Sequence, residues 1–331
     1  MTDPADDDAA TEQLTYADTG VDIEASEDAT AALLEAFGSD LTTEYAGLLD
    51  IGDRYLALAT DGVGTKLMVA EAIEDFSTIG IDCIAMNVND LVAAGVEPVA
   101  FVDYLAIDEP DDDLTNEIGE GLAVGLEESG MTLLGGETAV MPDVITGFDL
   151  AGTCAGLAGK DEILEGEAQV GDVLVGFASN GIHSNGLTLA REAVTRDHEY
   201  TDAFPHDDER TIGEELLRPT RLYTSLLEPM REHGVRAAAH ITGGGWTNLL
   251  RMGDYEYVIE DPFPAQPVFE FVQAEGKVTD EEMHRTFNMG TGFVVAVPED
   301  RAEALVADTD GQIIGHVEAG NSVEIRGLSL S

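Results

Sequence analysis

Hydrophobic residues along the chain alternate between short continuous runs and runs with helical spacing. Residues 56–60 form an apolar run as long as a buried strand. Beyond it, Val69, Ala72, Ile73 and Phe76 repeat at the i, i+3, i+4, i+7 spacing of a helix with one buried face. The same patterns predict strands over 99–107, 131–134, 173–177, 237–241 and 293–297, and helices over 81–92, 114–129, 301–307 and from 187 onward. Strands and helices therefore alternate through most of the chain.

The length of 331 residues suggests two domains. A polar stretch over 160–171 is the predicted linker, giving an N-terminal domain over 1–165 and a C-terminal domain over 166–331. The acidic residues 1–13 are expected to be disordered. A helix is expected over 28–37.

The charge is strongly unbalanced: 67 Asp and Glu stand against 15 Lys and Arg, a formal net charge of -52. Such self-repulsion destabilises a compact chain in dilute salt and is largely screened at molar salt. The hydrophobic content of 44% excludes an acidic disordered protein. We therefore expect a cytoplasmic protein of a cell with molar internal salt, although a basic partner is an alternative.

Several other classes are excluded or disfavoured. Bulk charge argues against nucleic-acid binding. No apolar run reaches the ~18 residues of a membrane span. The two cysteines, Cys83 and Cys154, lie in apolar settings, so free buried thiols are expected rather than a disulfide.

Residues 61–66 join the predicted strand to the predicted helix through two glycines, Gly62 and Gly64. Free N–H groups and the positive end of the helix dipole meet there, where a phosphate would bind. Lys66 adds a cation, and Asp61 would face a Mg²⁺ that the phosphates also bind. The alternative is a plain turn with a capping aspartate. The scarcity of lysine favours the phosphate site, because Lys66 is one of only three lysines in the chain.

Most carboxylates of so acidic a chain are expected to face solvent without a role in a site. Only those among apolar or glycine residues are therefore informative about a metal or ligand site. Asn87 and Asp90 are spaced i, i+3 on the polar side of the predicted helix over 81–92, where both would reach one ligand. Asp103 shares a strand face with apolar residues, so it is either paired with a donor or works on a metal or ligand. Glu137 follows two glycines at a strand end, as Asp61 precedes two.

Two loops of the C-terminal half carry histidines beside small polar residues. His183, Ser184 and Asn185 follow the strand over 173–177 and precede a helix. A lone histidine is more often structural, but this setting favours a ligand contact. His240 runs into a glycine turn over 242–245 whose N–H groups would bind an anion. Three strand-to-glycine turns with shielded acids suggest a phosphate-rich ligand and a metal, hence an ATP enzyme rather than a scaffold.

The ordered motifs resemble those of the phosphoribosylformylglycinamidine cyclo-ligase family, also called aminoimidazole ribonucleotide synthetases. The resemblance covers nearly the whole chain. Relatives such as thiamine-monophosphate kinase and selenophosphate synthetase share mainly the Asp-Gly loop and the acids, whereas His-Ser-Asn-Gly and His-Ile-Thr-Gly-Gly-Gly point to the cyclo-ligase. The motifs occupy residues 16–23, 61–66, 87–91, 135–138 with 141–142, 183–186, 240–245 and 285–288.

The resemblance implies an α+β fold of two domains, the first of which binds ATP and forms the dimer. Its four-stranded sheet would pair with that of a second copy into a β-barrel. The implied reaction uses ATP to activate the formyl oxygen of formylglycinamidine ribonucleotide, and the amidine nitrogen then closes the imidazole ring of aminoimidazole ribonucleotide. ADP and phosphate are the other products, in purine biosynthesis.

The resemblance also implies roles for particular residues. Lys66, His183 and His240 are the expected catalytic residues. The remaining sets are Asp61, Gly62, Gly64, Thr65, Lys66 and Asn87 for ATP; His183, Ser184, Asn185, Thr242, Gly243 and Gly244 for the substrate; and Asp61, Asp90 and Glu137 for Mg²⁺, with Asn87 and Asp103 behind them.

The chain departs from bacterial members of the family in one respect. Their N-terminal segment is basic and rich in glycine, whereas residues 24–53 here contain no basic residue, which is similar to an archaeal, halophilic form. Which group covers the ATP phosphates stays open. Two other functions also remain: a small-molecule kinase of the superfamily, and a catalytically silent nucleotide-binding subunit.

Overall fold

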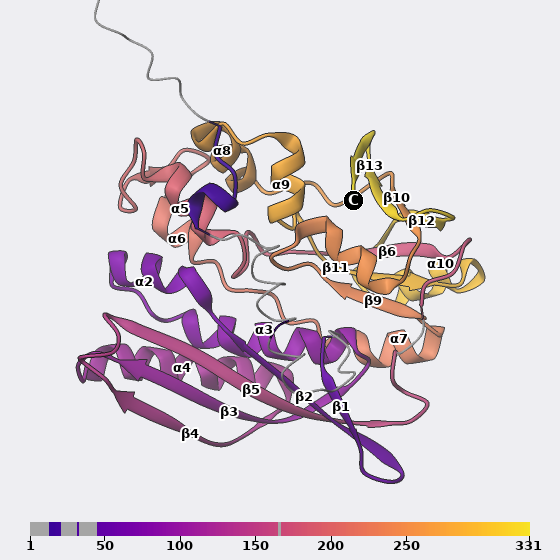
Figure 1. The fold of residues 1–331 in the computed structure, drawn as a ribbon, viewed down its shortest axis with the longest axis horizontal. Helices are drawn as coiled ribbons and strands as arrows, with labels where there is room; N and C mark the ends of the chain where they lie inside the picture. The colour runs from indigo at the N-terminus through magenta and orange to yellow at the C-terminus, as the bar shows by residue number, and fades with distance from the viewer. Residues whose placement is uncertain (1–12, 21–31, 33–44, 165–166) are drawn as a thin grey trace, which may run out of the picture.

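The computed structural model describes residues 13–20, 32, 45–164 and 167–331. Two sheets dominate this part of the chain, and the C-terminal half lies across the helices that cover the first sheet (Figure 1). The disorder expected over 1–13 and the helix expected over 28–37 concern residues that, apart from Gln13 and Ala32, lie outside the described residues.

The N-terminal half forms a five-stranded sheet in the order β1-β2-β5-β3-β4. β3 and β4 are parallel, with α4 as their crossover, and β5 runs antiparallel to β2 and β3 between them. The resemblance implied four strands; the fifth is the short edge strand β1. The elements are β1 (Gly47–Asp50), β2 (Arg54–Gly62), α2 (Leu67–Ile73), α3 (Ile79–Ala93), β3 (Glu97–Ile107), α4 (Asp112–Ser129), β4 (Thr132–Val140) and β5 (Phe148–Gly159).

Helix α3 is buried on nearly all sides because it lies between the first sheet and the C-terminal half (Figure 1). It packs closely on α4: a Cβ on Gly80 would lie 2.2 Å from Leu122 N, so this crossing requires glycine. Helix α4 begins where the Asp111 side chain accepts hydrogen bonds from two backbone N–H groups and ends at Gly130 in the left-handed conformation.

The C-terminal half forms a seven-stranded sheet in the order β14-β13-β10-β12-β6-β11-β9. Strand β11, which lies between β6 and the edge strand β9, is buried at every position. The elements are β6 (Val173–Ala178), α5 (Leu187–Val194), β7 (Ala203–Phe204), β8 (Asp207–Thr211), α6 (Ile212–Leu216), α7 (Leu227–His233), β9 (Ala237–His240), β10 (Glu256–Ile259), α8 (Pro267–Gly276), α9 (Asp280–Thr286), β11 (Thr291–Val297), α10 (Glu299–Asp308), β12 (Gln312–Glu318), β13 (Ser322–Ile325) and β14 (Leu328–Leu330).

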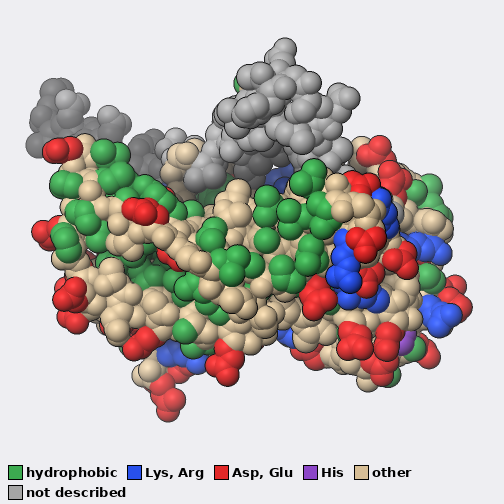
Figure 2. Space-filling view, turned by 90° about the horizontal axis from the view of Figure 1, so that it is seen from below, with side chains coloured by type: hydrophobic (Ala, Val, Ile, Leu, Met, Phe, Trp, Pro, Cys, Tyr) green, Lys and Arg blue, Asp and Glu red, His purple; other side chains and the backbone are tan. Residues whose placement is uncertain are grey.

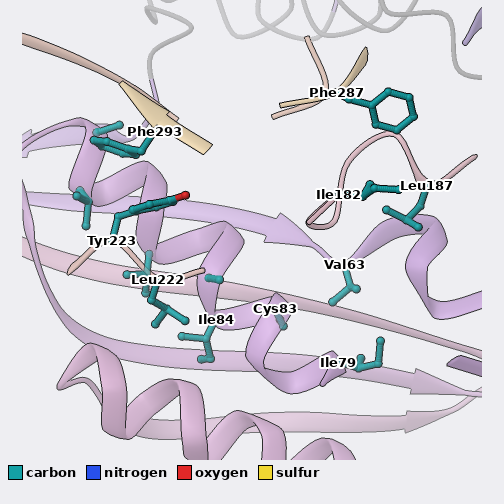
Figure 3. Packing of buried hydrophobic residues seen from close by; sticks show 14 of the residues in the cluster. Val63, Ile79, Cys83, Ile84, Ile182, Leu187, Leu222, Tyr223, Phe287 and Phe293 are labelled. Carbon is teal, nitrogen blue, oxygen red and sulfur yellow. The ribbon is translucent and has the colours of Figure 1, made fainter. Parts of the chain in front are cut away.

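One hydrophobic core runs through both halves. Figure 3 shows Val63, at the end of β2, between Cys83 of α3 on one side and Ile182 and Leu187 of the C-terminal half on the other. This shared core fixes the loop after β2 against the loop before α5. The domain boundary at 165/166 falls in the connection between β5 and β6 and stays a prediction. No described helix is long and apolar enough to cross a membrane.

The outer face of the five-stranded sheet, opposite the helices, is largely apolar and exposed. Leu58, Val102 and Tyr104 alternate with buried residues of β2 and β3, so their side chains lie on this face. Figure 2 shows hydrophobic side chains gathered over much of the molecule's underside. In so acidic a chain, this concentration of exposed apolar side chains is unusual.

The hydrophobic pattern predicted the main elements correctly, with one error that concerns the site. The strand predicted over 131–134 continues through Val140, so Gly135 and Gly136 lie within β4 and form no turn. A sheet ladder with β3 satisfies their backbone, and the Asp103 side chain covers Gly136. Glu137 therefore stands on a strand instead of at its end.

Candidate active site

The end of strand β2 is held in place by Asn87 of helix α3. The Asn87 side chain accepts a hydrogen bond from Asp61 N–H (3.0 Å) and donates to the Asp61 carbonyl (3.1 Å) and to the Cys83 carbonyl (2.9 Å). Because this fully buried side chain uses its polar atoms within the protein, Asn87 positions the loop. The expectation that it contacts ATP stays a prediction, and these contacts do not favour it.

A pocket of about 220 Å³ lies where the loop after β2 meets the loop before α5. It brings together six residues expected at the site from distant parts of the sequence: Asp61, Gly62, Gly64 and Thr65 from one loop, Ser184 and Asn185 from the other. Across it, the Thr65 and Thr188 hydroxyls lie 2.9 Å apart. The remaining wall consists of Tyr16, Val63 and Met86.

Asp61 is the charged group of this pocket. Burial, and then the negative charge of Asp90, raise the pKa of Asp61 from 3.8 to about 6. Asp90 itself is engaged by His240, whose Nδ1 lies 3.0 Å from Asp90 Oδ1. Two neighbouring carboxylates with one histidine leave a surplus of negative charge. A divalent cation bound by the carboxylates and by a phosphate would neutralise this surplus.

Lys66 does not reach this pocket. Its ammonium is fully buried, lies 2.7 Å from Asp82 Oδ2 and donates to the Arg218 carbonyl at 2.6 Å. Burial lowers the pKa of Lys66, and the adjacent Asp82 carboxylate opposes that shift. In this structure the chain turns inward at the loop and the ammonium has protein partners. The expectation that Lys66 faces the transferred phosphoryl group stays a prediction, and this geometry does not favour it.

Asp82 is the centre of this buried network, and sequence analysis did not single it out. Its Oδ1 accepts hydrogen bonds from Thr220 N (2.8 Å), Thr220 Oγ1 (2.6 Å) and Ser184 Oγ (3.1 Å), while its Oδ2 faces Lys66. Lys66 and Asp82 belong to the N-terminal half, whereas Ser184, Arg218 and Thr220 belong to the other. One charged cluster thus joins the two halves beneath the pocket. The available signal was an acid in the apolar helix over 81–92.

Glu137 lies far from the other expected metal ligands. In the sheet register Asp61 pairs with Gly152, Gly152 with Asp103, and Asp103 with Gly136, so these positions share the helix-covered face. Glu137 follows Gly136 and therefore points to the outer face. It is also three strands from Asp61, roughly 14 Å at the usual strand spacing. Within one chain, Glu137 cannot share a metal with Asp61, because strand order and alternation separate them.

Asp103 lies on the apolar side of β3, as the sequence predicted, and burial raises its pKa. It does not line the pocket described above. Among the described residues, the one group of three or more His, Cys, Asp or Glu whose ligand atoms lie within 4.8 Å of one another is Glu232, His233 and Asp308, none of which was expected at the site.

His183 is buried behind the pocket. Its Nε2 accepts a hydrogen bond from the Asn180 N–H at 3.1 Å, and its backbone is left-handed (φ 69°). Burial, together with the charge of His240, holds the pKa of His183 well below its usual value, so the ring is neutral. The hydroxyl of the next residue, Ser184, forms hydrogen bonds with the side chains of Asp82 and Thr220. His183 and Ser184 therefore shape the loop. Nδ1 of His183 has no hydrogen-bond partner among the described residues, and the expectation that His183 contacts substrate stays a prediction.

Asn185 is the residue of this loop that faces outward into the pocket region. Its oxygen lies 3.3 Å from where a Cβ on Gly243 would be, so the glycine turn over 242–245 lies alongside it. Within that turn, Thr242 N–H donates to Asn248 Oδ1 (2.7 Å) and Gly245 N–H to the Thr242 carbonyl. Two of the N–H groups expected to bind an anion are therefore used locally, whereas Gly243 and Gly244 remain partly exposed.

Two family models match consecutive parts of the chain: "AIR synthase related protein, N-terminal domain" over residues 43–158 and "AIR synthase related protein, C-terminal domain" over 169–327. A solved thiamine monophosphate kinase from Aquifex aeolicus is similar in fold, with a TM-score of 0.67 at 15% identity over 94% of this chain and 99% of that one. PurL from T. maritima, solved with ATP, has a TM-score of 0.58 at 17% identity over 86% of this chain and 44% of that one. The fold is therefore that of the AIR synthase related proteins.

Sequence comparison gives a narrower assignment. The chain is 48% identical over 329 residues to a phosphoribosylformylglycinamidine cyclo-ligase of Methanococcoides burtonii, covering 96% of this chain and 98% of the relative. It is 47% identical over 308 residues to that of Pyrococcus horikoshii, covering 88% and 90%. The chain belongs to the phosphoribosylformylglycinamidine cyclo-ligase family.

Proposed function

We propose that this chain catalyses ATP-dependent ring closure of formylglycinamidine ribonucleotide to aminoimidazole ribonucleotide. The observation that carries the proposal is the 220 Å³ pocket, which joins the Asp61–Thr65 loop to the Ser184–Asn185 loop in a chain of this family. A formamide oxygen is a poor leaving group until it is phosphorylated. Its attack on the γ-phosphorus of ATP releases ADP; the amidine nitrogen then attacks the formyl carbon, and phosphate and a proton leave.

The pocket residues divide between the two ligands in this proposal. The backbone of Gly62 and Gly64 and the hydroxyl of Thr65 hold ATP phosphates, and Asn185 with the turn at Gly243 orients the ribonucleotide. Phosphoryl transfer depends mainly on positioning and electrostatics. The rigid frame from Asn87 and the buried Lys66–Asp82 pair therefore contributes by fixing where the two loops meet.

Asp61 and Asp90 are the proposed Mg²⁺ ligands. Their chemistry fits a magnesium ion, because both are carboxylates, and burial together with the negative charge of Asp90 raises the pKa of Asp61. When bound, Mg²⁺ would neutralise charge on the phosphates. His240 donates to Asp90 or is oriented by it, and holds that carboxylate toward the site.

A homodimer is the proposed assembly, with the outer face of the five-stranded sheet as its interface. That face exposes Leu58, Val102 and Tyr104, and an exposed apolar face of this kind is typical of a protein interface. The net charge of -52 supports a cytoplasmic, halophilic enzyme, because molar salt screens its self-repulsion.

The proposal is tested by incubating the pure protein with ATP, Mg²⁺ and formylglycinamidine ribonucleotide in molar KCl. One aminoimidazole ribonucleotide should form for each ADP released, and no ADP should form without the ribonucleotide. Omission of the formyl group from the substrate is the matched control. ADP release without imidazole formation would contradict the proposal and indicate a kinase.

A further inference from the structure

The segment over 13–20 is docked on the C-terminal half, although it lies at the other end of the sequence. Leu14 is buried and its N–H donates to the Gly276 carbonyl at the end of α8 (3.3 Å). Tyr16 N–H donates to Glu282 Oε1 on α9 (2.7 Å). Gly20, in the left-handed conformation, ends the turn that Tyr16 begins. These contacts hold Tyr16 at one place on the surface.

That place is the wall of the pocket. The Tyr16 side chain lines it together with the loops that contain Thr65 and Asn185, so three segments from distant parts of the chain meet there. The ring packs on the hydrophobic core, burial raises the pKa of Tyr16, and a hydrogen bond from the Gly186 backbone lowers it. A hydroxyl that accepts from Gly186 retains its own proton to donate to a ligand.

The pocket wall offers neutral donors. Among the residues that the structure describes, no lysine or arginine lines it; the polar groups besides Asp61 are hydroxyls, an amide and backbone, including Thr65, Thr188 and Asn185. Its volume of about 220 Å³ is below the ~300–1,000 Å³ of pockets that enclose a whole drug-sized ligand, so it fits one end of a ligand. Neutral hydrogen-bond donors beside a carboxylate that can hold a cation suit a phosphate ester.

We propose that Tyr16 is a specificity-determining residue that closes this pocket around a phosphate group and donates its hydroxyl proton to it. The inference rests on the proposed function for the identity of the phosphorylated ligands, ATP and the ribonucleotide. It gives a role to Tyr16, the first residue of the 16–23 motif. Glu282 is the corresponding positioning residue, because it anchors the Tyr16 backbone.

The test measures binding and turnover of Tyr16→Phe, which removes only the hydroxyl, by calorimetry in molar KCl. Two probes are titrated separately: ATP with Mg²⁺, and ribose 5-phosphate. We expect affinity for one of them to fall about 3- to 10-fold, the range of one net hydrogen bond, with the melting temperature unchanged. A loss for ATP assigns the phosphate to the nucleotide, and a loss for ribose 5-phosphate assigns it to the ribonucleotide. The KM of the corresponding substrate, ATP or the ribonucleotide, should rise with kcat nearly unchanged.

Variants of the anchor provide the matched comparison. Glu282→Gln keeps an oxygen that can accept from Tyr16 N–H and should bind like wild type, whereas Glu282→Ala should weaken the same probe as Tyr16→Phe does. Glu281→Ala, one residue earlier on α9, should change the affinity for neither probe. Unchanged binding of both probes by Tyr16→Phe, or wild-type protein that binds neither, would overturn the proposal. Because binding is measured without turnover, failure of ring closure alone would count against the proposed function and leave this comparison intact.

Discussion

The ammonium of Lys66 lies 2.7 Å from the carboxylate of Asp82, and neither side chain is exposed to solvent. Both belong to the N-terminal half, but their other partners, the Arg218 carbonyl, Thr220 and Ser184, belong to the C-terminal half. A buried ion pair with all its partners in place fixes geometry more than it adds stability. Here it fixes the two loops of the pocket relative to each other.

Lys66→Met should therefore destabilise the fold, because it leaves the Asp82 carboxylate buried without its cation. The expected loss is about 3–5 kcal/mol in the free energy of unfolding, measured by chemical unfolding in molar KCl. The double variant Lys66→Met with Asp82→Leu should recover much of that loss, since replacing a whole buried pair by apolar residues is often neutral. Lys160→Met, which disrupts an exposed pair with Asp50, should leave the unfolding curve nearly unchanged.

A stable Lys66→Met protein that binds ATP normally but turns over poorly would contradict this account. That result would indicate that Lys66 contacts the phosphate during the reaction, and that its ammonium moves away from Asp82 when the ligand binds.

Asp61→Asn should stabilise the ligand-free protein while abolishing activity. The pKa of Asp61 is raised to about 6 in the fold, against 3.8 unperturbed. The ionised carboxylate therefore costs on the order of 3 kcal/mol near neutral pH, and that cost disappears as the pH falls below about 4. The difference in melting temperature between Asp61→Asn and wild type, in the absence of metal, should grow from pH 4 to pH 7. A difference in melting temperature that does not change with pH would show that ionisation of Asp61 does not destabilise the fold.

Glu137→Gln should leave the Mg²⁺ dependence of ATP binding within about twofold of wild type, because its position on β4 is three strands from Asp61. Asp61→Asn should weaken the Mg²⁺-dependent binding of ATP by at least tenfold, since the substitution removes a charged metal ligand. Titration of ATP at several Mg²⁺ concentrations compares the two. An equal loss in both variants would mean that the metal site is completed by Glu137 of a second copy across the outer sheet face.

Dilution of salt should unfold the protein. With a formal net charge of -52, repulsion grows as the screening length lengthens from roughly 3 Å at 1 M to about 10 Å at 0.1 M. Circular dichroism across a KCl series should show cooperative loss of structure, shifted to lower salt by MgATP because a ligand of the native state stabilises it. A spectrum and melting temperature unchanged in dilute buffer would contradict the halophilic interpretation.

The sequence pattern predicted most strands and helices because the apolar spacing that buries a face is local information. It also marked the 61–65 loop and the 184–185 loop as ligand-binding loops, since each stands between a strand and a helix beside small polar residues. The pocket brings both loops to one place.

Side-chain direction was the information that the sequence lacked. Lys66 was expected at the phosphate, but one turn of 3-10 helix aims it inward, where Asp82 receives it. Glu137 resembles Asp61 in its glycine neighbours, yet side-chain alternation along β4 places it on the other face of the sheet. Tyr16 reaches the pocket through contacts with distant residues, among them Glu282, 266 residues later, which accepts from its backbone N–H. Such long-range contacts follow from tertiary packing, which no local spacing encodes.

The central claim is that ATP phosphorylates the formyl oxygen before the ring closes. Formylglycinamidine ribonucleotide labelled with heavy oxygen in the formyl group tests it most directly, with mass analysis of the phosphate released by wild-type protein in molar KCl. The account predicts that each inorganic phosphate carries one heavy oxygen, because the labelled atom leaves with phosphorus when the amidine nitrogen closes the imidazole. Label recovered in water, with unlabelled phosphate, would contradict it.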